Sequence, residues 1–139
     1  MTNDLMVMRY LKVQSGKGFS VDKYLNDYFP TREAYAVGGA TDSVEMVDNN
    51  LLSFNAFRDI MELNIEFIEK SERYFRNVDP IGAPDNYQKV IGAWVNDEGY
   101  AFIEVSDIIF DRDEAIALGV ERGEEAIWDF KNSCEIKLT

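Results

Sequence analysis

The clearest periodic pattern of hydrophobic and polar residues lies between Ser53 and Arg76. At about 100° per residue the large apolar side chains fall within one broad arc, and a helix gains most of its stability by packing such an arc against a core. Ser53 is a residue type that caps helix N-termini. The pattern therefore predicts a long helix over residues 53–76. The expected buried arc contains Phe57, Ile60, Met61, Phe67, Ile68, Tyr74 and Phe75.

Acidic residues recur every three or four positions on the other side of this predicted helix, so they form one stripe. We expect this side to face solvent. Arg73 and Arg76 continue the same side at the C-terminal end, where cations suit the helix dipole. The acidic stripe consists of Asp59, Glu62, Glu66 and Glu69.

Segments rich in valine, leucine and tyrosine predict strands before this helix. Residues 5–13 predict one strand, and residues 34–37 and 44–47 predict two shorter ones. By contrast, residues 20–29 predict a short helix that ends before Pro30, since proline disrupts a helix interior.

A β-hairpin is predicted after the long helix. Residues 87–95 and 100–106 read as two strands around the turn residues 96–99. Gly92 indicates a bulge or a close approach of the backbone. Trp94 lies within the apolar pattern of the first strand, which favours packing in the core over stacking on a ligand.

A second, shorter helix is predicted over residues 112–122. Asp111 followed by Glu114 has the form of an N-cap with its capping-box partner, and Asp113 lies in the first turn, where the dipole favours anions. Gly119 or Gly123 is expected to end this helix. Three more acids lie in its last turn and exit, where the dipole does not favour them, so they require another explanation: Glu121, Glu124 and Glu125.

The chain closes with two predicted strands, at 126–130 and 134–138, around a turn at 131–133; Trp128 is expected in the core. These elements together predict an α+β fold. Its mainly antiparallel sheet is packed by one long and one or two shorter helices, in two layers. A length of 139 residues suits a single domain over 1–139.

Charge is the most unusual bulk property of the chain. Its 26 acidic and 14 basic residues give a net charge of −12. A field of this sign repels nucleic acids and anionic membranes, because affinity for either depends on Lys and Arg. Basic protein surfaces are attracted instead. Solubility is the alternative reason for the acidity.

Several classes of catalytic and metal site are excluded by composition. The chain has no histidine, which removes the commonest general base and transition-metal ligand. With Cys134 as its one cysteine, the chain cannot assemble a structural zinc site. We therefore expect no catalytic residue, no metal and no cofactor.

Three weaker patterns do not by themselves indicate a site. The segment "SGKGFS" at 15–20 lacks the spacing of a phosphate-binding loop. Asp107, Asp111, Asp113 and Glu114 are close in sequence but lack the order of a calcium loop. Carboxylate pairs could also catalyse glycoside hydrolysis, although spacing alone selects no pair in so acidic a chain.

Several segments resemble a class of small uncharacterised phage and prophage proteins. They are "GFS", "PTREAYAVGG", "VIGAWVNDEGYAFIEVSDIIFDRDEAIALGVERGEEAIWDF" and "EIKL". The resemblance covers roughly residues 16–47 and 88–139 and leaves out the helix at 53–76. It implies a virus or mobile element of bacteria, and it carries over no functional residue.

Charge and this resemblance together lead to a functional expectation. The chain is expected to be a non-enzymatic binding protein that inhibits a host defence protein by occupying a basic, nucleic-acid-binding surface. Direct binding to nucleic acid or to a membrane is not expected, and the pattern indicates no oligomeric state. Without a signal peptide or a long apolar run, the expected location is the cytoplasm of a bacterial host. The expected partner-binding residues are Asp59, Glu62, Glu66, Glu69, Glu121, Glu124 and Glu125.

Two alternatives remain open. One is a binder of small, nucleotide-type ligands that uses Lys17, Arg32 or Arg9. The other is a small hydrolase that uses carboxylates, which two buried acids facing a cleft would favour.

Overall fold

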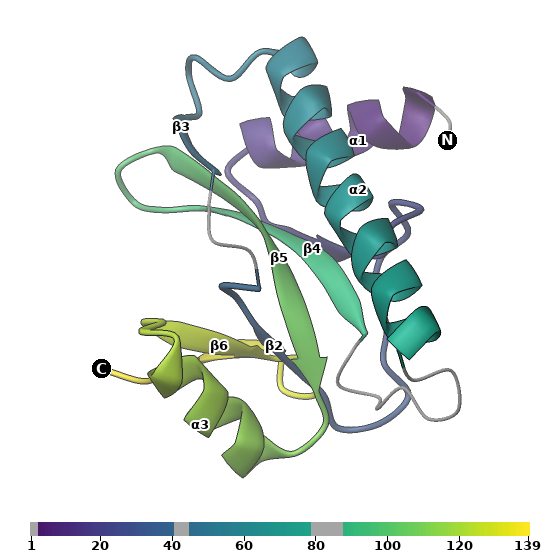
Figure 1. The fold of residues 1–139 in the computed structure, drawn as a ribbon. Coiled ribbons are helices and arrows are strands. Elements are labelled where there is room, and N and C mark those ends of the chain that lie inside the picture. The colour runs from purple at the N-terminus through teal and green to yellow at the C-terminus, as the bar shows by residue number, and fades with distance from the viewer. Residues whose placement is uncertain (1–2, 41–44, 79–87) are drawn as a thin grey trace.

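The fold is α+β, as predicted, with three helices and a seven-stranded antiparallel sheet in the described part of the chain (Figure 1). The computed structural model describes residues 3–40, 45–78 and 88–139, with side chains over 4–40, 46–73 and 88–139. In chain order the elements are α1 (Asn3–Gln14), β1 (Phe19–Val21), β2 (Tyr35–Val37), β3 (Glu45–Asp48), α2 (Phe54–Val78), β4 (Lys89–Val95), β5 (Tyr100–Ile109), α3 (Arg112–Glu121), β6 (Ala126–Asp129) and β7 (Cys134–Lys137).

Strand β5 is the centre of the sheet. The strand order is β1-β4-β5-β2-β6-β7, and β3 pairs with β5 as well. Because β4 occupies one edge of β5, strands β3 and β2 share the other edge: β3 pairs with residues 100–103 and β2 with residues 107–109. All of these pairings are antiparallel.

Alternation along β5 assigns its side chains to two faces. Ile103 and Val105 belong to the main core beneath α1 and α2 (Figure 1). Ile109 belongs to a second core beneath α3. Phe102 and Glu104 point to the other face, which the three helices leave uncovered.

Helix α2 confirms the most periodic pattern in the sequence. The Ser53 hydroxyl accepts a hydrogen bond from the backbone N–H of Ala56, so Ser53 is the N-cap as predicted. Phe57, Met61 and Ile68 are buried, with Ile60 and Phe67 partly so. The expected burial of Tyr74 and Phe75 lies outside the described side chains.

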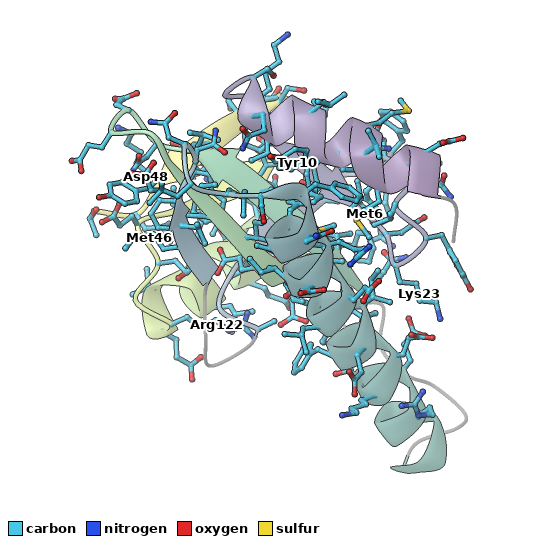
Figure 2. All side chains as sticks on the ribbon, turned by 90° about the horizontal axis from the view of Figure 1, so that it is seen from above. Met6, Tyr10, Lys23, Met46, Asp48 and Arg122 are labelled. Atoms are coloured by element: carbon cyan, nitrogen blue, oxygen red, sulfur yellow. The ribbon has the colours of Figure 1, made fainter. Side chains whose placement is uncertain are left out.

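Residues 5–13 form a helix, so the predicted strand is wrong. Met6, Arg9 and Val13 are buried, and Tyr10 is partly buried, at the spacing of one helix face. Figure 2 places Met6 and Tyr10 on the side of α1 that faces α2. A cation, Arg9, therefore occupies a core position in this helix. Because this position is not apolar, the helical spacing of apolar residues is not visible in the sequence.

Residues 20–29 form strand β1 and a turn, so the predicted short helix is wrong. The Asp22 carboxylate accepts hydrogen bonds from the backbone N–H groups of Tyr24 and Asn26, at 2.8 and 3.1 Å. Such a bond competes with helix formation. Leu25 is fully buried in the resulting turn with a φ of 68°.

The other predicted strands and the second predicted helix follow the predicted order. Strands β2, β3 and the β4–β5 hairpin occur where the sequence indicated, within a few residues. Gly92 pairs in continuous register with Glu104, so the expected bulge is not formed, and nothing lies within 3.4 Å of a Cβ built there. Asp111 caps α3 by accepting a hydrogen bond from the Glu114 N–H at 2.9 Å. The helix ends just before Gly123, whose φ is 72°.

The predicted terminal strand pair is present as β6 and β7. The buried Asp129 carboxylate stabilises the turn between them by accepting hydrogen bonds from the backbone N–H groups of Lys131 and Asn132. Within the residues that the structure describes, no helix is both long enough and apolar enough to cross a membrane.

Candidate functional site

The acidic stripe of α2 lies on the exposed side of the helix. All four of its members, Asp59, Glu62, Glu66 and Glu69, are exposed, as predicted. Glu66 pairs with Lys70 one turn later at 2.8 Å. This ion pair neutralises part of the stripe and lowers the pKa of Glu66. The line of negative charge along α2 is therefore interrupted at Glu66, the third of its four acids.

The three acids at the C-terminal end of α3 and just beyond it lie in two environments. Glu121 and Glu125 are exposed, whereas Glu124 is half-buried and points toward Glu104. Because α2 and α3 pack over different parts of the sheet, the acids of the two helices form separate surfaces (Figure 1). The seven predicted partner-binding residues are thus not brought together.

Glu104 and Glu124 converge on Gly38 at the end of β2. A Cβ built on Gly38 would overlap the Oε1 atoms of both carboxylates. Glu104 is 4% exposed and accepts a hydrogen bond from the Gly39 N–H at 3.3 Å. Glycine at position 38 therefore leaves room for the two carboxylates, which a residue with a Cβ at this position would displace.

The environment of Glu104 opposes its ionisation. Burial, reinforced by the negative charge of Glu124, raises the pKa of Glu104 from 4.5 to about 7, while the Gly39 N–H and Arg122 act in the opposite direction. Burial also raises the pKa of Glu124, and Arg122 opposes that shift. The pair consequently contains a carboxyl group that titrates near neutral pH.

Asp107 is the centre of a buried ion-pair network beside this pair. Its two oxygens accept from Lys89 Nζ and from Arg122 Nη2, both at 2.6 Å. Arg122 Nη1 also donates to the carbonyl oxygens of Val37 and Gly38, at 3.3 and 3.0 Å. Arg122 therefore fastens the end of α3 to β2 and β5.

Two of the acids that are close in sequence and could have been metal ligands have structural roles instead. Asp107 is paired with two cations and Asp111 caps α3, so both carboxylates already have partners within the fold. Over the described side chains, no group of three or more Cys, Asp or Glu residues has an arrangement that could hold a metal ion.

The bases of the small-ligand alternative lie in different environments. Arg9 is 7% exposed, donates two hydrogen bonds to the Leu25 carbonyl oxygen, and lies 3.3 Å from Asp27. It therefore stabilises the turn after β1. Lys17 is exposed, and the Arg32 guanidinium lies over the Phe110 ring at 4.3 Å.

Both tryptophans are exposed, so their predicted place in the core is wrong. Trp94 is 41% and Trp128 is 37% exposed, because their positions on β4 and β6 point to the face without helices. Trp94 stacks on Phe102, with ring centroids 5.0 Å apart and an interplanar angle of 6°. Trp94 is therefore an exposed ring stacked on the partly buried Phe102, and its open surface is a candidate contact surface.

Comparison with known proteins identifies no relative from which a function could be transferred. No protein-family model matches the chain, and no curated protein or solved structure is detectably similar to it. A function therefore has to be inferred from the acidic and aromatic surfaces of the chain itself.

Proposed function

We propose that this protein is a non-enzymatic inhibitor that binds a basic, nucleic-acid-binding surface of a host defence protein. The observation that carries the proposal is the exposed acidic stripe of α2 on a chain with a net charge of −12. Opposite charge attracts such a partner over long range and accelerates its association.

The spacing of the stripe supports competition with nucleic acid. Residues three or four positions apart on a helix rise about 4.5 to 6 Å along the axis. A basic groove that neutralises phosphates would meet a comparable line of negative charge. Glu121 and Glu125 offer a second, separate contact of the same sign.

A capture experiment with two matched variants tests this proposal. Basic proteins of a bacterial host are enriched on heparin and passed over the immobilised protein at low salt. The first variant reverses Glu62, Glu66 and Glu69 to lysine. The second changes the net charge equally by reversing acids exposed elsewhere: Glu33, Asp97 and Glu135.

The proposal expects the wild-type protein and the second variant to retain the same basic protein and the first variant to lose it. Duplex DNA should release the retained basic protein, because DNA and the acidic stripe of α2 would compete for the same basic surface of that protein. Equal retention by both variants, or retention that DNA leaves unchanged, would contradict the proposal.

A carboxylate hydrolase is the second candidate, and the Glu104 and Glu124 pair favours it. A carboxylic acid with a pKa of about 7 can donate a proton at neutral pH while a neighbouring carboxylate stays ionised. Chromogenic glycosides and phosphate esters test this candidate. Turnover by the wild-type protein that Glu104→Gln abolishes would support a hydrolase, whereas no turnover would support the binding protein.

A further inference from the structure

Strand β7 leaves one edge of the sheet open. It is the last strand in the order β1-β4-β5-β2-β6-β7, and among the described strands it pairs with β6 alone. The Leu138 N–H donates to the Glu125 carbonyl oxygen at 2.8 Å, so Leu138 bonds toward β6. Because this bonding alternates along an antiparallel strand, Ile136 also bonds toward β6, whereas the backbone N–H and C=O groups of Glu135 and Lys137 point away from it. The outer edge of β7 therefore offers backbone donors and acceptors to another strand.

The side chains of β7 are complementary to a second copy of the same strand. The strand reads CEIK over Cys134–Lys137, and Glu135 and Lys137 are both exposed. When two copies run antiparallel with Ile136 opposite Ile136, Glu135 of each copy lies opposite Lys137 of the other. Opposite charges directly across two strands attract. This register also brings the outward-pointing N–H and C=O groups of Glu135 and Lys137 together, so the two copies can exchange backbone hydrogen bonds.

The neighbouring registers of such a pair are unfavourable. A shift of one residue places outward-pointing backbone groups opposite inward-pointing ones, so they cannot bond. A shift of two residues places Glu135 opposite Glu135 in one direction and Lys137 opposite Lys137 in the other, and like charges directly opposite repel. Charged side chains commonly protect an edge strand from pairing. The alternating signs on β7 instead leave one register open.

The other two edge strands of the described sheet are less suited to pairing with a second copy. The outer side of β1 is occupied by the segment that follows it, because the Tyr28 N–H donates to the Ser20 carbonyl oxygen at 3.0 Å. Strand β3 carries only acids as charged residues, Glu45 and Asp48. An antiparallel pair of two β3 strands would therefore bring acids together. Self-complementary charge distinguishes β7 from both.

We propose that two copies of this protein pair antiparallel through β7, around a two-fold axis at Ile136, so that the sheet continues from one copy into the other. Ile136 packs against the core beneath α3, and contact between the two Ile136 side chains adds apolar burial on that face. A contact of this symmetry closes after two copies. Self-association goes beyond the proposed function and does not rest on it. Helix α2 contacts β4 and β5, which β2 and β6 separate from β7, so the acidic stripe stays open in the dimer (Figure 1).

Sedimentation equilibrium measures the dimerisation constant, at a salt concentration that screens the repulsion between two copies of net charge −12. Glu135→Lys and Lys137→Glu each place like charges opposite one another in both pairs of the dimer. A double variant with both changes exchanges the two charges and keeps the net charge at −12. Lys131→Glu, an exposed lysine in the β6–β7 turn, is the control for the change in net charge. Thermal unfolding verifies that each variant is folded.

The proposal expects the wild type, the double variant and Lys131→Glu to dimerise alike, and each single β7 variant to dimerise about tenfold more weakly. Mixing Glu135→Lys with Lys137→Glu should restore dimerisation as a mixed dimer, because lysine then lies opposite glutamate in both pairs. A wild type that stays monomeric at every concentration, single variants that dimerise like the wild type, or a mixture that stays as weak as its components would overturn the proposal.

Oxidative cross-linking tests the register. Ile136→Cys, made together with Cys134→Ser, places two thiols directly opposite each other in a non-hydrogen-bonded pair, where Cα atoms are about 4.5 Å apart and a disulfide can form. The native Cys134 is exposed, but it lies four residues out of register with its own copy, at about 3.4 Å per residue, which is too far for a disulfide. Mild oxidation should therefore give a covalent dimer of the Ile136→Cys variant and none of the wild type. A folded Ile136→Cys variant that does not cross-link, or a wild type that cross-links through Cys134, would overturn this register.

Discussion

Replacing Glu104 by glutamine should make the stability of the protein less sensitive to pH. The folded state raises the pKa of this carboxyl from 4.5 to about 7, so folding favours its protonated form. Below pH 4.5 the Glu104 carboxyl is neutral in both the folded and the unfolded state, so it does not lower the free energy of unfolding. As the pH rises from 4.5 to 7 the unfolded state releases the proton first, and the fold loses stability.

The size of this loss follows from the shift. Each unit of pKa corresponds to about 1.4 kcal/mol, so an ionised Glu104 destabilises the fold by roughly 3 kcal/mol above pH 7. Glutamine is neutral at every pH and keeps an oxygen for the Gly39 N–H. The free energy of unfolding of Glu104→Gln should therefore exceed that of the wild type by about 2 to 3 kcal/mol at pH 8 and by little at pH 4.5.

Urea unfolding, followed by tryptophan fluorescence from pH 4.5 to pH 8, measures this difference. Other titrating groups are common to both proteins, so they largely cancel. Glu98→Gln, an exposed change in the β4–β5 turn, is the control and should show no pH-dependent difference. A difference for Glu104→Gln that stays constant with pH, or a variant that is less stable at pH 8, would refute the reasoning.

Three further predictions concern stability. Ile68→Ala should reduce the free energy of unfolding by about 2 to 5 kcal/mol, because Ile68 is 2% exposed in the main core; a loss below about 1 kcal/mol would contradict its place there. Gly38→Ala should lower the melting temperature by displacing the Glu104 and Glu124 carboxylates, and Gly99→Ala, where a Cβ would meet nothing within 4 Å but φ is 87°, separates this overlap from backbone strain. EDTA should leave the melting temperature unchanged, and a large drop would reveal a metal that stabilises the fold.

The fold was predictable where one simple period governed a segment. Helix α2 repeats every three to four residues and the β4–β5 hairpin has turn residues between two strand patterns, so both were identified. The sequence of α1 predicts a strand instead of a helix because Arg9 occupies a core position, where it pairs with Asp27 in a long-range contact that no local pattern contains. The turn at Asp22 was missed because its side chain replaced helical hydrogen bonds.

The candidate site was less predictable than the fold. Alternation along β5 did not indicate that Glu104 would be buried, because Glu104 meets Glu124 only through pairing of strands distant in sequence. Two signals were present: the Gly38–Gly39 pair, and the lack of a capping role for Glu124. The apolar pattern around Trp94 predicts a core position because such a pattern does not distinguish the covered face of a sheet from the open one.

Association kinetics test the central claim, binding through the acidic surface of α2, most directly. The association rate constant of the captured basic protein is measured over a series of salt concentrations for the wild type and for the variant with Glu62, Glu66 and Glu69 reversed to lysine. Charges at an interface act mainly on encounter, so the rate should be slower in the variant and should lose most of its salt dependence. A folded variant that associates at the wild-type rate, with the same salt dependence, would contradict the account.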